Sequence, residues 1–158
     1  MRGWGEEELA ALGKIVLNFA ALDTLAGVMV EGFLEERQVA SVLVAGEPTL
    51  WKLEKLSVLA GELLHEPYRQ SVLDWTKGMR VINERRNQLL HSLYVVSHEE
   101  QSSMARLKAS TRGGKWRAHS EQVALGQLQE LVELMAEGIT TGQVVVATLP
   151  ESQDWHGR

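Results

Sequence analysis

The feature that most constrains the fold is a stripe of apolar residues that repeats through the segment 67–95 at alternating steps of three and four. Residues at these spacings share one face of an α-helix, because the helix has about 3.6 residues per turn. Six of the seven stripe positions are apolar and the other is an arginine: Val72, Trp75, Met79, Ile82, Arg86, Leu89 and Leu93. A guanidinium on a core-facing stripe is costly unless it is paired or lies at the mouth of a cleft. The segment therefore predicts a long buried helix with one polar site.

Three more segments carry the same kind of stripe and predict helices at about 6–37, 49–64 and 121–138. Gly32 is a place where the first helix could break, with a second short piece over 37–44. Ser120 is expected to cap the last helix. The segment 143–149 reads either as a short strand or as a continuation of that helix.

The apolar period changes between Tyr94 and Gln122. Small or apolar residues alternate with basic ones over 104–110 and 115–119, and Thr111-Arg112-Gly113-Gly114 between them are turn residues. This alternation predicts a β-hairpin at about 104–119. An isolated hairpin is only marginally stable, so we expect it to pack on the helices or on another copy of the chain.

Together these elements predict a mainly all-α fold, an up-and-down bundle of about four to five helices with a β-hairpin inserted before the last long helix. The length of 158 residues suits one domain. We expect a single helical-bundle domain over 1–150 and a flexible tail over 151–158. No cysteine is present, which excludes disulfides and a cysteine nucleophile. With no secretory signal and no uninterrupted apolar run of about 18 residues, we expect a cytoplasmic protein without a membrane span.

Basic residues are concentrated in the segment 80–117 of this acidic chain, whose net charge is −5. That segment has eight basic and three acidic residues, a net charge of +5, whereas the remainder has eight basic and eighteen acidic residues, a net charge of −10. The overall charge argues against broad, non-specific binding to nucleic acid. The positive segment is then either a charge-balanced surface loop or a local site for phosphate.

Arg86, Asn87 and His91 are the residues of this segment that could carry chemistry. At about 100° per residue, Asn87 and His91 lie on one helix face, whereas Arg86 and His91 are roughly 140° apart. Arg86 and His91 therefore need a facing surface to act together, and a second copy of the same helix is the expected one. Histidine can exchange a proton near neutral pH, and arginine can stabilise charge on a phosphate. The alternative is a structural role, with Arg86 in a surface pair or a salt bridge.

The histidines are scattered, and no two stand at i, i+4 with a glutamate between them, as a helical zinc site needs. No glycine-rich loop with a lysine is present to hold a nucleotide phosphate. We therefore expect neither a metal site nor a cofactor.

The residues Arg86-Asn87-Gln88-Leu89-Leu90-His91 resemble the Arg-Asn-x-x-x-His motif of the HEPN superfamily. Their setting is also similar, late in a long helix of an all-α bundle that covers about 6–140. The stretch Phe19-Ala20-Ala21-Leu22-Asp23 resembles the first helix of such domains, where an acidic residue often faces the motif helix.

The resemblance implies a compact homodimer whose motif helices meet across a two-fold cleft. In active members it implies metal-independent endoribonuclease activity, in which the 2′-hydroxyl of RNA attacks the adjacent phosphate and leaves a 2′,3′-cyclic phosphate. On this transfer Arg86 would stabilise the transition state, His91 would be the general acid or base, and Asn87 would position them.

The resemblance also suggests supporting residues and partners. Asp23 and Glu84 would hold Arg86. The hairpin departs from the simplest four-helix form of such domains, and we expect it either to bind the RNA substrate through Arg106, Lys108 and Arg117 or to extend the dimer interface. Many such domains act in toxin–antitoxin or phage-defence systems, often beside a nucleotidyltransferase-like antitoxin. Others lack nuclease activity, so the alternative is a catalytically inactive dimerisation or interaction module, or a nucleotide-binding domain, that uses the same helix.

Overall fold

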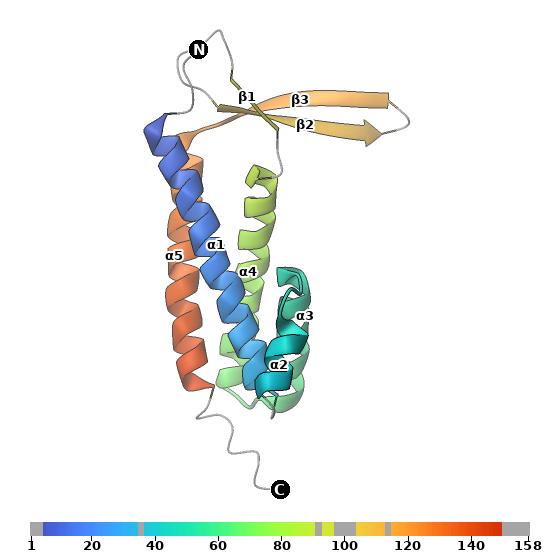
Figure 1. Ribbon diagram of the computed structural model, residues 1–158, viewed down its shortest axis with the longest axis vertical. Coiled ribbons are helices and arrows are strands. Elements are labelled where there is room, and N and C mark those ends of the chain that lie inside the picture. Colours follow the sequence, from blue (N-terminus) through green and yellow to red (C-terminus); the bar gives the residue numbers. More distant parts are fainter. Residues whose placement is uncertain (1–4, 35–36, 91–92, 97–103, 113–114, 150–158) are drawn as a thin grey trace, which may run out of the picture.

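The computed structural model describes residues 5–34, 37–90, 93–96, 104–112 and 115–149. These residues form five α-helices and three strands, in the order α1 (Glu6–Gly32), α2 (Arg37–Val44), α3 (Thr49–Leu63), α4 (Tyr68–Leu90), β1 (Leu93–Val96), β2 (Met104–Arg112), β3 (Lys115–Val123) and α5 (Leu125–Thr148). The long helices α1, α4 and α5 run side by side, α2 and α3 lie near one end of them, and the strands cross the other end (Figure 1). The mainly helical bundle predicted from the sequence is confirmed.

The core lies between α1, α3, α4 and α5, where the apolar stripes of the helices meet. The α4 stripe is buried as predicted, since Val72, Trp75, Met79, Ile82 and Leu89 are each at most 8% exposed. The largest fully buried side chains come from all four helices: Ile15, Leu22, Met29, Leu53, Leu56, Val72, Met79, Leu128, Leu131 and Met135. Burial of this kind stabilises the fold by about 1.5–3 kcal/mol for each large apolar side chain.

Several predicted helix boundaries are wrong. The break after Gly32 is confirmed, but α4 ends at Leu90 rather than near 95, and the β-branched Val95 and Val96 lie in β1. Ser120 lies in β3, and the residue that precedes α5 is Ala124, whose backbone N–H donates to Gln127 Oε1 at 3.0 Å. Residues 143–148 continue α5 as a helix. The tail predicted over 151–158 lies outside the described residues.

Helix α5 continues through Gly138 and Gly142. At both positions, side chains of α1 and α4 occupy the space that a larger residue would need. A β-carbon added at Gly142 would lie 2.7 Å from Trp75 Nε1, and one added at Gly138 would lie 3.2 Å from Ile82 Cδ1. Trp75 Nε1 also donates a hydrogen bond to the Gly138 carbonyl at 2.9 Å. The two glycines let α4 approach α5 closely, which offsets their low helix propensity.

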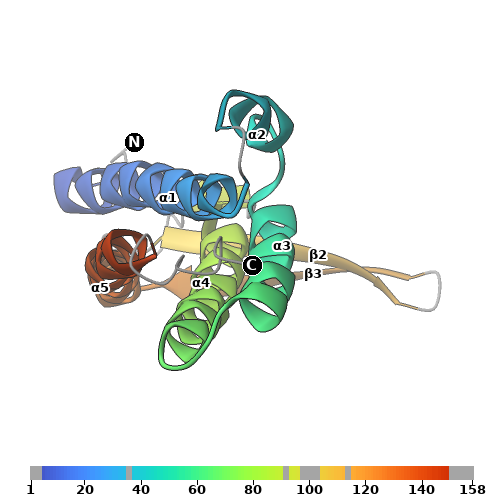
Figure 2. The same cartoon turned by 90° about the horizontal axis from the view of Figure 1, so that it is seen from below.

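The strands form one antiparallel sheet in the order β1-β2-β3. Strands β2 and β3 lie where the sequence predicts a hairpin, whereas the segment now seen as β1 was assigned to the preceding helix. Figure 2, seen along the bundle, shows β2 and β3 extending beyond the helices on one side. The sheet crosses the end of the bundle at which α4 ends and α5 begins (Figure 1).

Helix α1 is the one described helix that is long and apolar enough to cross a membrane by length and composition, with a mean hydropathy of 1.5. A core helix of a soluble protein meets the same criterion, and the inner face of α1 is packed in the bundle core. Its outer face is also apolar, since Leu9, Val16, Leu17 and Val28 are exposed.

Candidate functional site

The candidate site is built around Arg86, one turn before the end of α4. The helix brings its side chain to α1, where the guanidinium carbon lies 4.4 Å from the centroid of the Phe19 ring. A cation on an aromatic face at this distance is attracted by the ring quadrupole, by about 0.5–2 kcal/mol depending on desolvation. The Phe19 ring, on the apolar stripe of α1, thus compensates the charge of Arg86, which interrupts the apolar stripe of α4.

The hydrogen-bonding capacity of Arg86 is only partly used. Its Nη1 donates to Asn87 Oδ1 at 2.8 Å, while its buried Nε has no hydrogen-bond partner. Among the described residues no carboxylate forms an ion pair with it. A guanidinium has five N–H donors and keeps its charge, so this half-buried cation can accept an anionic ligand.

Asn87 holds Arg86 in place, because its side-chain oxygen accepts the guanidinium hydrogen bond. The sequence predicted a positioning role for this amide, and the geometry gives it a partner within the motif. One turn earlier on α4, Asn83 is buried at 7% exposure. His91 lies outside the described residues, so its predicted place beside Asn87 stays a prediction.

The role predicted for Asp23, a carboxylate partner of Arg86, is wrong. Asp23 Oδ2 accepts a hydrogen bond from Lys52 Nζ at 2.7 Å, and Oδ1 accepts one from Thr49 Oγ1 at 2.7 Å. The Lys52 side chain is only 8% exposed, and a buried ammonium without a carboxylate partner is costly. Arg86 already stacks on the Phe19 ring, so leaving it without the Asp23 carboxylate costs less free energy. Asp23 therefore joins α1 to α3 instead of holding the motif helix.

Glu84 does not hold Arg86 either. It is exposed, and its Oε1 accepts a hydrogen bond from Gln88 Nε2 at 3.3 Å, one turn along α4. The neighbouring Arg85 pairs instead with Glu130 of α5 at 3.1 Å. Beside this ion pair is a hollow of about 200 Å³, and Arg86 is not among the residues that line it: Arg85, Gln88, Leu89, Gln127, Glu130 and Leu131.

The sheet register brings together the basic residues that the sequence predicted as substrate contacts. Lys108 pairs with His119, Arg106 with Glu121, and Ser110 with Arg117. Directly paired residues, and residues two apart on a strand, share one face of a sheet. By backbone register, one face of the sheet has the positions of Arg106, Lys108, Arg112, Lys115 and Arg117, and also that of Glu121. Arg86 and this sheet lie toward the same end of the bundle (Figure 1).

Sequence reasoning missed Phe19 and Lys52. Phe19 was recognisable only as one more apolar residue on the first stripe, although an arginine on a facing stripe is a signal for an aromatic partner. Lys52 carries no local signal, because its burial depends on Asp23, 29 residues away. Among the described residues no three His, Asp or Glu side chains gather in a group that could hold a metal ion.

Comparison of the chain with protein families, with curated proteins and with solved structures gives no match. The proposals that follow therefore depend on the residues and their geometry.

Proposed function

We propose that this chain is a HEPN-like, metal-independent endoribonuclease that acts on RNA as a homodimer. The observation that carries the proposal is Arg86, a half-buried cation with a free, buried Nε and no carboxylate partner among the described residues. A phosphate that becomes pentacoordinate carries the charge that such a guanidinium would meet.

Each motif residue has a separate role in the proposal. Arg86 stabilises the transition state, and its stacking on Phe19 and its bond to Asn87 hold the guanidinium in one orientation before substrate binds. His91 follows Arg86 by five residues and serves as general acid or base for the 2′-hydroxyl or the 5′-oxygen. The 2′-hydroxyl attacks the adjacent phosphate, the bond to the 5′-oxygen breaks, and a 2′,3′-cyclic phosphate remains.

The sheet supplies the substrate surface in this proposal. Its register gives one face five basic positions and one acidic position, Glu121, and a mainly basic face attracts the phosphate groups of a single strand. The hairpin of β2 and β3 would guide RNA toward the end of α4. Positive charge here also fits an acidic protein that binds RNA locally without binding nucleic acid broadly.

A second copy of the chain completes the site in the proposal. The outer face of α1 offers a surface for it, an exposed and uncharged stripe: Leu9, Gly13, Val16, Ala20, Thr24 and Val28. Phe19, on which Arg86 stacks, lies on the buried side of α1, whereas Ala20 is exposed on this stripe. Pairing of two α1 helices along the stripe would form the homodimer of the proposal.

An RNA cleavage assay in excess chelator tests the proposal. Wild type should cleave and leave 2′,3′-cyclic phosphate ends, and RNA with 2′-O-methyl groups should resist. Arg86→Ala and His91→Ala should each lose about two or more orders of magnitude in rate. Arg85→Ala is the matched control, because it removes an adjacent arginine that pairs with Glu130, and it should keep most of the activity. Equal cleavage by all four proteins, or cleavage by none, refutes the enzyme proposal.

A catalytically inactive dimerisation or interaction module is the second candidate. It is favoured by the contacts that Arg86 makes inside its own bundle, with Phe19 and Asn87. In that case Arg86→Ala would lower stability and dimer formation while wild type cleaves no RNA. Sedimentation of wild type at micromolar concentration bears on both candidates, since a strict monomer lacks the shared cleft.

We place the proposed enzyme in the cytoplasm, in a toxin–antitoxin or phage-defence setting. Under this proposal a nucleotidyltransferase-like antitoxin restrains it. Growth arrest on expression of wild type, but not of Arg86→Ala, is the expected cellular result.

A further inference from the structure

A groove of about 470 Å³ runs between α4 and α5. Arg86 is not among the described residues that line it. Twelve residues form its walls and floor: Ser71, Asp74, Trp75, Gly78, Met79 and Ile82 of α4, and Leu134, Glu137, Gly138, Thr141, Val144 and Val145 of α5.

The groove follows the two helices that form its walls. Its α4 wall runs from Ser71 to Ile82 and its α5 wall from Leu134 to Val145, which is about 16 Å or three helical turns on each side. The rim residues on both walls are exposed at steps of three or four: Ser71, Asp74 and Gly78 on α4, and Glu137, Thr141 and Val144 on α5. The opening therefore extends along the whole length, as a helix-binding groove does and an enclosing small-molecule pocket does not.

The space beside Gly78, in the middle of the α4 wall, is free of side chains. A β-carbon added at Gly78 would meet no atom within 4 Å, so a residue of a partner could occupy this space. Below it the floor is apolar, since Trp75, Met79 and Ile82 are at most 4% exposed and pack into the core. Val144 on the opposite rim is 59% exposed, which adds an apolar contact at the edge.

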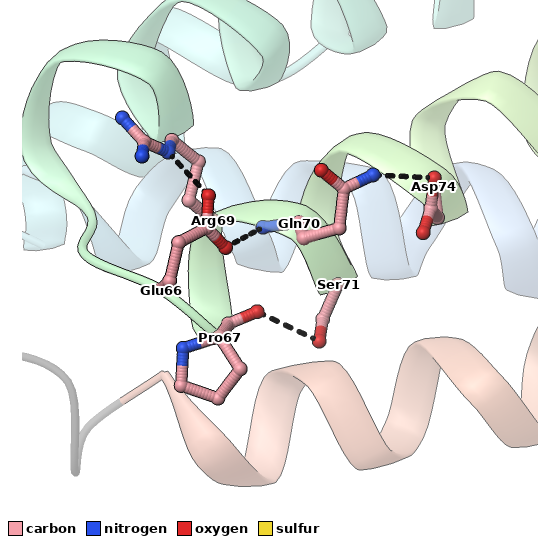
Figure 3. Close-up of polar contacts among 6 residues, drawn as sticks. All are labelled: Glu66, Pro67, Arg69, Gln70, Ser71 and Asp74. Atoms are coloured by element: carbon pink, nitrogen blue, oxygen red, sulfur yellow. Dashed lines mark hydrogen bonds and ion pairs between the residues drawn. The ribbon is translucent and has the colours of Figure 1, made fainter.

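Charge indicates what kind of helix would fit. Each wall contributes one carboxylate, Asp74 on α4 and Glu137 on α5, and no lysine or arginine is among the described residues that line the groove. Asp74 accepts a hydrogen bond from Gln70 Nε2 at 2.8 Å, which holds the carboxylate at the rim (Figure 3). Ser71, also drawn there, donates to the Pro67 carbonyl at 3.2 Å at the start of α4. The two rims therefore attract a basic partner.

We propose that this groove binds an amphipathic α-helix of a partner protein. The helix has apolar residues at i, i+3 or i+4, and i+7 that lie on the floor, and Lys or Arg beside them that pair with Asp74 and Glu137. This inference is separate from the proposed nuclease function, because the described residues that line the groove do not include Arg86 or Asn87.

Selection from a displayed library of 16-residue helical peptides, randomised at apolar and charged positions, tests the inference. Wild-type protein is the target and Gly78→Leu is the counter-target. The leucine fills the groove, yet the open space at this position lets the variant fold, which circular dichroism checks. Gly61→Leu on α3 is the matched control, because a β-carbon there also meets no atom within 4 Å and the residue lies outside the groove.

The expected peptides carry the apolar spacing with flanking Lys or Arg. Fluorescence anisotropy should show at least a tenfold weaker Kd for Gly78→Leu and for the double variant Asp74→Asn with Glu137→Gln, and an unchanged Kd for Gly61→Leu. Peptides without basic flanks, peptides that bind Gly78→Leu as tightly as wild type, or no selected peptide at all would each overturn the inference. RNA cleavage by wild type plays no part in this result, so the two proposals fail independently.

Discussion

Replacement of Gly142 by alanine should destabilise the bundle, although alanine is the better helix former. Gly142 is buried in α5, and an added β-carbon would lie 2.7 Å from Trp75 Nε1, 3.0 Å from Trp75 Cε2 and 3.1 Å from Leu25 Cδ1. Trp75 cannot move away at low cost. It is 4% exposed, and its Nε1 is bonded to the Gly138 carbonyl.

The expected magnitude combines three effects. Helix propensity favours alanine by about 1 kcal/mol. Overpacking a close contact costs about 1–3 kcal/mol, and disturbing the indole hydrogen bond costs about 1 kcal/mol more. The free energy of unfolding of Gly142→Ala should therefore fall by about 1–3 kcal/mol.

Gly78→Ala is the matched control, because it makes the same chemical change in the middle of α4 where a β-carbon meets nothing. Propensity alone then acts, and stability should rise by about 0.5–1 kcal/mol. Urea denaturation followed by far-UV circular dichroism measures both variants. In thermal unfolding followed by the same signal, the melting temperatures of the two variants should differ by roughly 5–15 °C. If Gly142→Ala is as stable as wild type, the close approach of α4 and α5 at Trp75 is wrong.

Three other changes test separate contacts. Asp23→Ala leaves the buried Lys52 ammonium without its carboxylate, so the free energy of unfolding should fall by about 3 kcal/mol. Lys52→Met should lower it much less. Equal losses for the two variants in urea denaturation would contradict this. Phe19→Leu removes the ring under the motif arginine and should cost about 1–2 kcal/mol by the same assay, whereas a neutral result would argue against stacking. The hydrogen bond from Arg69 lowers the pKa of the Glu66 carboxyl, and the Gln70 backbone N–H also lowers it. The stability that the Glu66 carboxylate contributes is present above its unfolded-state pKa and is lost as pH falls through its lower folded-state pKa. Arg69→Gln should raise the pKa of Glu66 in an NMR titration. An unchanged pKa would count against the hydrogen bond from Arg69 to Glu66.

The sequence was sufficient for features that depend on local periodicity. The stripe on α4, the break at Gly32 and the alternation over 104–119 all come from spacings within one segment. Boundaries were less predictable where tertiary contacts decide them. Helix α5 contains Gly138 and Gly142, which leave room for the Trp75 side chain of α4. Trp75 and these glycines are more than 60 positions apart, so no local pattern reports their contact.

The candidate site shows the same division. That Arg86 needs compensation followed from its stripe position, but the identity of its partner did not. The sequence suggested Asp23, an acid on the first helix, as the partner of Arg86. In the structure Asp23 pairs with Lys52, and Arg86 stacks on the ring of Phe19, one turn before Asp23 on α1. Both residues lie on α1, so the facing helix was identified correctly and the residue was not.

The pairing of the first long helix with the last has a consequence for synthesis of the chain. Helix α1 packs along α5, but 92 residues separate Gly32 from Leu125. At roughly 5–20 residues per second, a ribosome needs about 5–20 seconds to make that stretch. During this interval Ile15, Leu22 and Met29 have no α5 to cover them. The nascent chain is thus open to chaperones and to aggregation until its final helix emerges.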